Sequence, residues 1–106
     1  MGIPTRSSWL ILNRANRVVD TVKISEGGVT GTVVDPKKVY KYALDAYACS
    51  IILIHNHPSG NISPSEADKA ITTKLVNAGK MLDIAVLDHI IIGGEQYYSF
   101  ADNGQL

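Results

Sequence analysis

Two histidines and one aspartate stand out in this sequence because their types and spacing suit metal chemistry. His55 and His57 are separated by one residue and follow directly after the apolar run 51–54. Side chains in a strand alternate with a period of two, so a strand that ends here directs both imidazoles to the same side. Asp68 follows near the start of the next expected helix. Two imidazoles and one carboxylate, with a fourth position open, form the ligand set of a catalytic zinc site.

Each of these residues also has a plain structural interpretation. Histidine in an H-x-H pair can serve simply as a hydrogen-bonding loop residue, and the dipole of a helix favours an aspartate such as Asp68 in its first turn. The chemical interpretation predicts zinc (Zn2+) bound by His55, His57 and Asp68. Zinc in such a site lowers the pKa of bound water to about 7 and polarises a carbonyl.

A strand, a turn and a helix must bring these three side chains together. Residues 50–54 contain an unbroken run of apolar side chains, most of them β-branched, which is typical of a buried strand. The run 63–66 predicts a helix start, with Ser63 as the cap, Pro64 in the first helical position and Glu66 completing a capping box. Apolar residues at helical spacing then extend this helix to Gly79.

The rest of the chain predicts further strands and one more helix. Residues 9–12 and 18–24 read as two strands of a hairpin around the turn 13–16. Asp35 and Pro36 predict the start of a helix that runs to about residue 48. Strands at 84–92 and 96–100, around a Gly-Gly turn, complete the chain. Strands that alternate with helices predict an α/β or α+β layering.

Length and composition fit one folded domain, residues 1–106. The chain is 45% hydrophobic and 19% charged, which excludes wholesale disorder. The formal net charge of zero gives no general support for nucleic-acid binding. The single cysteine, Cys49, excludes an intramolecular disulfide, and no run is long enough to span a bilayer, so we expect no membrane association and a cytoplasmic location. We expect residues 1–8 to be disordered or foreign to the natural protein.

Longer motifs carry a resemblance to a known family. Ser65 follows Pro58 by seven positions and Asp68 follows Ser65 by three, and this pattern after His55 and His57 resembles the JAMM signature of MPN-domain metalloproteases. The match extends over almost the whole chain and resembles the RadC-like JAB domains of bacteria, particularly those of Bacteroidetes. The runs that carry it are 12–18, 31–35, 55–61, 64–68 and 87–93.

The resemblance implies a cytidine-deaminase-like MPN (JAB) fold of the α/β class, a mixed β-sheet with flanking helices. It also implies that His55, His57 and Asp68 hold zinc, and that Ser65 orients the substrate and donates a hydrogen bond to the developing oxyanion. The implied reaction is hydrolysis of a peptide or isopeptide bond by zinc-bound water, so a protein or peptide substrate is expected. Deamination is excluded, because it requires an H-x-E and a later C-x-x-C that this sequence lacks.

The general base of the JAMM reaction has no clear counterpart in this sequence. The resemblance calls for a glutamate just before the first strand, where residues 5–8 are Thr-Arg-Ser-Ser, and the guanidinium of Arg6 cannot act as a base. Of the three glutamates, Glu66 has the expected capping role and Glu95 lies in a late turn. Glu26, beside a glycine-rich turn, remains as the candidate base.

Several functional alternatives stay open at this point. A catalytically inactive zinc-binding or protein-interaction module of a RadC-type, DNA-repair-associated protein is the main alternative. RadC proteins usually carry a helix-hairpin-helix segment as the natural DNA contact, and we see none here, so nucleic acid is not expected as a partner of this domain alone. We expect His89 to be a structural histidine hydrogen-bonded through Asp88. The apolar run 90–92 lies near a C-terminal edge strand and could pair between two chains, so a homo-oligomer is a further alternative.

Overall fold

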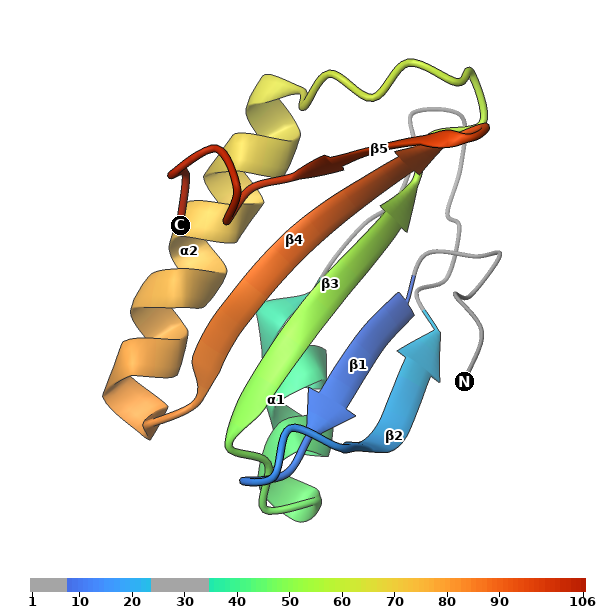
Figure 1. Ribbon diagram of the computed structural model, residues 1–106. Helices are drawn as coiled ribbons and strands as arrows, with labels where there is room; N and C mark the ends of the chain where they lie inside the picture. The colour runs from blue at the N-terminus through green and yellow to red at the C-terminus, as the bar shows by residue number, and fades with distance from the viewer. Residues whose placement is uncertain (1–7, 24–34) are drawn as a thin grey trace.

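The computed structural model describes residues 8–23 and 35–106. Five strands form one sheet in the order β2-β1-β3-β4-β5 (Figure 1). β3 and β4 run parallel, and each of the other neighbouring pairs is antiparallel. The predicted mixed α/β sheet with flanking helices is therefore confirmed. The elements in chain order are β1 (Ser8–Leu12), β2 (Val18–Lys23), α1 (Pro36–Asp45), β3 (Ser50–Asn56), α2 (Glu66–Leu82), β4 (Ala85–Gly93) and β5 (Gln96–Ser99).

The core lies between the two helices and one face of the sheet. Trp9 pairs with Leu53 across β1 and β3, and both side chains are almost fully buried. Leu75 of α2 and Tyr40 of α1 belong to the same buried cluster. The Tyr40 hydroxyl donates a hydrogen bond of 2.6 Å to the carbonyl of Leu75, which ties α1 to α2. Both helices are therefore fixed against the strand that ends at the histidine pair.

The predicted hairpin of β1 and β2 is confirmed, and a local side chain explains its turn. The Asn13 Oδ1 atom accepts hydrogen bonds from the backbone amides of Ala15 and Arg17, at 2.9 and 3.1 Å. Asn16 takes a left-handed conformation with φ 57°, which asparagine tolerates better than most residues. Ser8, which we expected outside the fold, is the first residue of β1 and is 1% exposed. β1 thus begins one residue earlier than predicted.

The start of α1 follows the prediction, whereas α2 begins two residues later than predicted. Asp35 caps α1 by accepting a 3.0 Å hydrogen bond from the amide of Lys37. In α2 the cap is Ser65 rather than Ser63. The Ser63 amide already donates to Oδ1 of Asn61, at 3.0 Å, so it is not free to bond a carboxylate three residues ahead. A capping box that begins at Ser63 would need this amide.

The end of α2 also differs from the prediction, because the helix passes through Gly79 and ends at Leu82. Gly79 does not terminate the helix but permits close packing. A Cβ atom there would lie 2.2 Å from the carbonyl oxygen of Ile84 and 2.8 Å from the hydroxyl of Tyr40. The left-handed residue that ends the helix is Asp83, with φ 56°.

The β3-α2-β4 connection places the end of β3 beside the first turn of α2. In Figure 1 the loop that follows β3 runs across the end of the sheet where β3 finishes and leads into the start of α2. β4 lies between β3 and β5, so the backbone of residues 90–92 is paired on both sides. The edge strand beside this run is β5, and pairing between chains stays a prediction. No helix among the described residues is long and apolar enough to cross a membrane.

Candidate metal centre

The structure brings His55, His57 and Asp68 together at the shared end of β3 and α2. The Nδ1 atom of His55 lies 3.1 Å from Oδ1 of Asp68, and the Nε2 atom of His57 lies 3.4 Å from Oδ2. Each carboxylate oxygen thus faces a different imidazole. The centroids of the two imidazole rings are 4.7 Å apart, with the rings nearly perpendicular. The convergence expected from the spacing of these three residues is present.

A backbone carbonyl fixes the tautomer of His57. Its Nδ1 atom lies 2.7 Å from the carbonyl oxygen of Asn61. A carbonyl only accepts hydrogen bonds, so the proton of the neutral ring is on Nδ1 and the lone pair is on Nε2. That lone pair faces Asp68. A histidine that binds a metal through one ring nitrogen commonly donates a hydrogen bond from the N–H of the other nitrogen to a carbonyl. This bond orients the ring and raises the basicity of the ligand nitrogen.

Asp68 is held by the first turn of its own helix. Its Oδ2 atom accepts a 2.9 Å hydrogen bond from the Ser65 amide, and the Ser65 hydroxyl oxygen accepts a 3.0 Å hydrogen bond from the Asp68 amide. Burial alone raises the pKa of the Asp68 carboxyl, but hydrogen bonds from His55 and Ser65 outweigh burial and hold that pKa well below its ordinary value. Asp68 is therefore an anion at neutral pH, as a metal ligand must be.

Ser65 is exposed, and its hydroxyl is used in the cap only as an acceptor. Because a hydroxyl is both donor and acceptor, its hydrogen remains available to a group in solvent. Ser65 thus stands next to the Asp68 carboxylate with a free donor. The helix cap is the feature that fixes Ser65 there, and the role that the resemblance implies for Ser65 stays a prediction.

His89 also lies in this cluster, which the sequence reasoning missed. It is 1% exposed, and its ring stacks on Phe100 at 4.4 Å and faces His55 at 5.9 Å between centroids. Its Nδ1 atom lies 2.5 Å from the hydroxyl oxygen of Thr72. One ligand atom from each of His55, Asp68 and His89 can be chosen so that all three atoms lie within 4.8 Å of one another. These residues could hold a metal ion.

The expected link between His89 and Asp88 exists only through the backbone. The His89 amide donates to Oδ1 of Asp88 at 2.8 Å, whereas the imidazole takes part in the cluster. Burial lowers the pKa of His89 to about 4, so the ring is neutral at neutral pH. The strand period contains a signal for this position: His89 and Ile91 share a face of β4, and a histidine on a buried face needs a partner.

The remaining candidate residues do not join the cluster in the described part of the chain. Glu26 lies outside the described residues. The side chain of Glu66 is 94% exposed and lies 3.5 Å from Lys69, and Glu95 is exposed in the turn before β5. Among the described residues, Asp68 is the one carboxylate grouped with the imidazoles as a candidate metal ligand.

The chemistry of the donors fits zinc better than a hard cation. Imidazole nitrogens with a single carboxylate are typical zinc ligands, whereas magnesium and calcium prefer oxygen donors. The Nε2 atom of His89 is buried and has no hydrogen-bond partner among the described residues, which is a further reason to expect a cation nearby. The side chains of His55 and His57 are 16% and 19% exposed, so the cluster is partly accessible to solvent.

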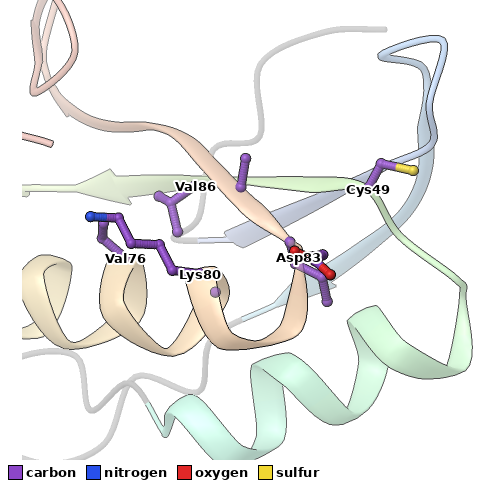
Figure 2. A pocket seen from close by; sticks show the side chains of 8 residues that line it. Cys49, Val76, Lys80, Asp83 and Val86 are labelled. Carbon is purple, nitrogen blue, oxygen red and sulfur yellow. The ribbon is translucent and has the colours of Figure 1, made fainter.

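A separate hollow lies at the other end of α2. Its volume is about 420 Å³, and it is lined by residues near the end of α2 and the starts of β3 and β4 (Figure 2). Cys49, Lys80 and Asp83 are among its lining residues. None of the three predicted zinc ligands, and neither Ser65 nor His89, lines it. We therefore place the candidate site at the histidine cluster and not in this hollow.

Comparisons with known proteins identify the family. A family model described as RadC-like JAB domain matches residues 6–105. A UPF0758 protein of Flavobacterium johnsoniae is 48% identical over 103 residues, which are 96% of this chain and 45% of that protein. The UPF0758 protein YfjY of Escherichia coli K12 is 47% identical over 97 residues, 92% of this chain and 61% of that protein. The chain spans about half the length of the curated relatives it matches. Its sequence match and its mixed five-stranded sheet agree, and the chain belongs to the family of RadC-like JAB domains.

Proposed function

We propose that this domain is a zinc-dependent hydrolase that cleaves peptide or isopeptide bonds. The observation that carries the proposal is the buried Asp68 carboxylate, whose two oxygens face His55 and His57 at the helix start. Zinc bound there would polarise the scissile carbonyl and lower the pKa of a water molecule to about 7. The substrate class, a protein or peptide, follows from the JAMM resemblance.

The residues around the cluster support this proposal by their hydrogen bonds. Asn61 holds the His57 ring in the tautomer that leaves Nε2 free to bind a metal. Ser65 has a hydroxyl hydrogen free to donate to the oxygen of a carbonyl as negative charge develops on it. The capping box fixes Ser65 relative to Asp68, so this donor and the metal ligands keep one geometry.

The open side of the cluster suits an extended substrate. Residues 58–61, in the loop that joins β3 to α2, are all exposed, and they lie directly next to His57. A cluster reached through exposed polar loop residues admits a flexible segment of a polypeptide more readily than a folded surface. This supports the cleavage of linkers, chain ends or isopeptide-linked tails.

The proposal is tested by measuring cleavage and metal content together. The natural chain is loaded with one equivalent of zinc and offered a panel of fluorogenic peptides and isopeptide-linked peptides. We expect turnover that disappears on chelation, returns with zinc, and is absent in His57→Ala. Lys74→Ala, a change at an exposed position of α2, serves as the control that keeps full activity. Bound zinc without any cleavage of the panel would contradict the proposal.

A second candidate function is a zinc-dependent module that binds a protein partner without cleaving it. The observation that favours it is the lack of a second carboxylate in the metal cluster among the described residues. Arg6→Glu places a carboxylate where the family resemblance calls for one. Cleavage that appears only in Arg6→Glu would support the binding module for the natural chain. Cleavage by the natural chain that is lost in Glu26→Gln would support hydrolysis with Glu26 as the base.

A further inference from the structure

His89 has a buried nitrogen that the fold leaves without a partner. Its Nε2 atom is inaccessible to solvent and has no hydrogen bond among the described residues. His89 pairs with Leu53 across β3 and β4, and Ile91 pairs with His55. Paired residues of neighbouring strands point to the same face, so His89 lies on the same face as His55, two pairs away along the strands.

The hydrogen bonds of Thr72 determine which nitrogen of His89 carries the proton. The Thr72 hydroxyl donates to the backbone carbonyl of Asp68, at 2.8 Å. Its single hydrogen is then used, so at 2.5 Å it accepts a hydrogen bond from Nδ1–H of His89. In the neutral ring this leaves a lone pair on Nε2. The helix turn that contains Asp68 therefore sets the tautomer of His89.

This buried lone pair is suited to a cation. The His89 ring stacks on Phe100 and on His55, and its Nε2 atom, in the plane of the ring, has no hydrogen-bond partner among the described residues. One ligand atom from each of His55, Asp68 and His89, with either ring nitrogen counted for a histidine, lies within 4.8 Å of the other two, so the three residues could hold one ion. A histidine that served only to fill the core would not need its tautomer fixed with a free lone pair in the interior.

We infer that Nε2 of His89 is a fourth protein ligand of the metal, in addition to His55, His57 and Asp68. The inference rests on the proposed metal site and changes its chemistry. Four protein ligands satisfy a tetrahedral zinc ion, so the water molecule of the proposed hydrolysis would have to enter as a fifth ligand, a coordination number that zinc reaches in some catalytic sites. His89 then anchors the ion from the buried side, while His57 holds it at the rim.

The direct test counts the nitrogens bonded to the metal. Cadmium-113 replaces zinc in the full chain labelled with ¹⁵N-histidine, and scalar coupling between ¹¹³Cd and each imidazole nitrogen is measured by NMR. We expect coupling to three histidines, including Nε2 of His89. Coupling to His55 and His57 without His89 overturns this inference but leaves the proposed function intact. Failure to bind any cadmium or zinc overturns both.

Two substitutions separate a ligand from a residue that only supports the site. His89→Asn keeps a side-chain N–H near Thr72 but removes the Nε2 atom. Thr72→Val keeps Nε2 but removes the hydroxyl that sets the tautomer. Zinc affinity is measured by competition with a chelator, and circular dichroism checks the fold of each variant. Loss of a supporting partner costs roughly 10–100-fold in affinity, which we expect for Thr72→Val, and we expect a larger loss for His89→Asn. An unchanged affinity in folded His89→Asn contradicts the inference.

Discussion

Asp68 combines two tasks that the sequence alone presents separately. It completes the capping box of α2 with Ser65, and it places one oxygen toward each of two imidazoles. The sequence offers two overlapping pairs of serine and acidic residue at this helix start, 63 with 66 and 65 with 68. Local pattern cannot choose between them. The bond from the Ser63 amide to the Asn61 side chain makes the choice, since it occupies the amide that a capping box at Ser63 would use.

Ser65 offers a test that separates its structural task from its proposed catalytic one. Ser65→Ala removes both the cap and the hydroxyl donor. We expect it to lower the free energy of unfolding by about 1 kcal/mol and to reduce kcat by roughly 100-fold or more. Ser65→Thr keeps a capping hydroxyl, so it should retain most of both. Urea denaturation and peptide cleavage of the two variants check this. A Ser65→Ala enzyme with full kcat and reduced stability would leave the cap as its only task.

The place of His89 in the metal cluster cannot be predicted from its neighbours in the sequence. The sequence places it next to Asp88, ahead of an isoleucine run, and a structural histidine is the simplest interpretation of that context. The structure confirms the hydrogen bond to Asp88, but only for the backbone amide. The ring lies beside Asp68 and His55 because β4 pairs in parallel with β3. Neither the register of that pairing nor the partner strand can be read from residues 85–93 alone.

α2 is the element that positions the site, and its packing depends on Gly79, which the sequence pattern predicts as the end of the helix. Glycine is common just after a helix end, so Gly79 was expected to stop α2. The helix instead continues to Leu82, and Asp83 takes the left-handed conformation. Gly79 lies against the Ile84 carbonyl, a contact across the turn into β4. Sequence patterns located both helices, but the function of this glycine depends on a tertiary contact.

Gly79→Ala should destabilise the protein although alanine is the better helix former. The added Cβ atom would lie 2.2 Å from a backbone oxygen, so the helix end must move. Alanine gains about 1 kcal/mol in helix propensity, while overpacking costs about 1–3 kcal/mol, and the backbone contact places this case at the upper end. We expect a net loss of about 1–2 kcal/mol in urea denaturation. Asn77→Ala, at an exposed position of the same helix, is the control expected to be neutral or slightly stabilising. A stabilised Gly79→Ala variant would show that the turn relaxes without cost.

The metal cluster draws on three elements that are distant in the sequence. His55 comes from β3, Asp68 from α2 and His89 from β4, and the parallel β3-α2-β4 unit unites them. The spacing of residues 55–68 was enough to predict the first two, because a strand end, a short loop and a helix start lie close together. Strand order and the parallel pairing are properties of the whole sheet. The sequence patterns predicted strands and helices but not this arrangement.

The pH dependence of stability in the metal-free protein tests the buried state of His89. Burial lowers the pKa of this ring to about 4 from an ordinary value of 6.5, and Asp68, His55, Asp88 and His57 are the charged or titratable groups around it. The unfolded chain therefore takes up a proton as the pH falls below 6.5, whereas the folded chain does so only near pH 4. Stability is lost across this window, by about 2 kcal/mol between pH 8 and pH 5.

Urea denaturation of the chelated protein at a series of pH values measures this loss. His89→Asn cannot titrate here, so its stability should fall less than that of the natural chain between pH 6.5 and pH 4. The low pKa of Asp68 gives stability that is present above the ordinary pKa of an aspartate and lost only in more acidic solution, so the two groups act in different windows. Equal losses in the natural chain and in His89→Asn would mean that protons reach the His89 ring in the folded state. The His89 ring would then be accessible to water, and the burial of this residue would not hold in solution.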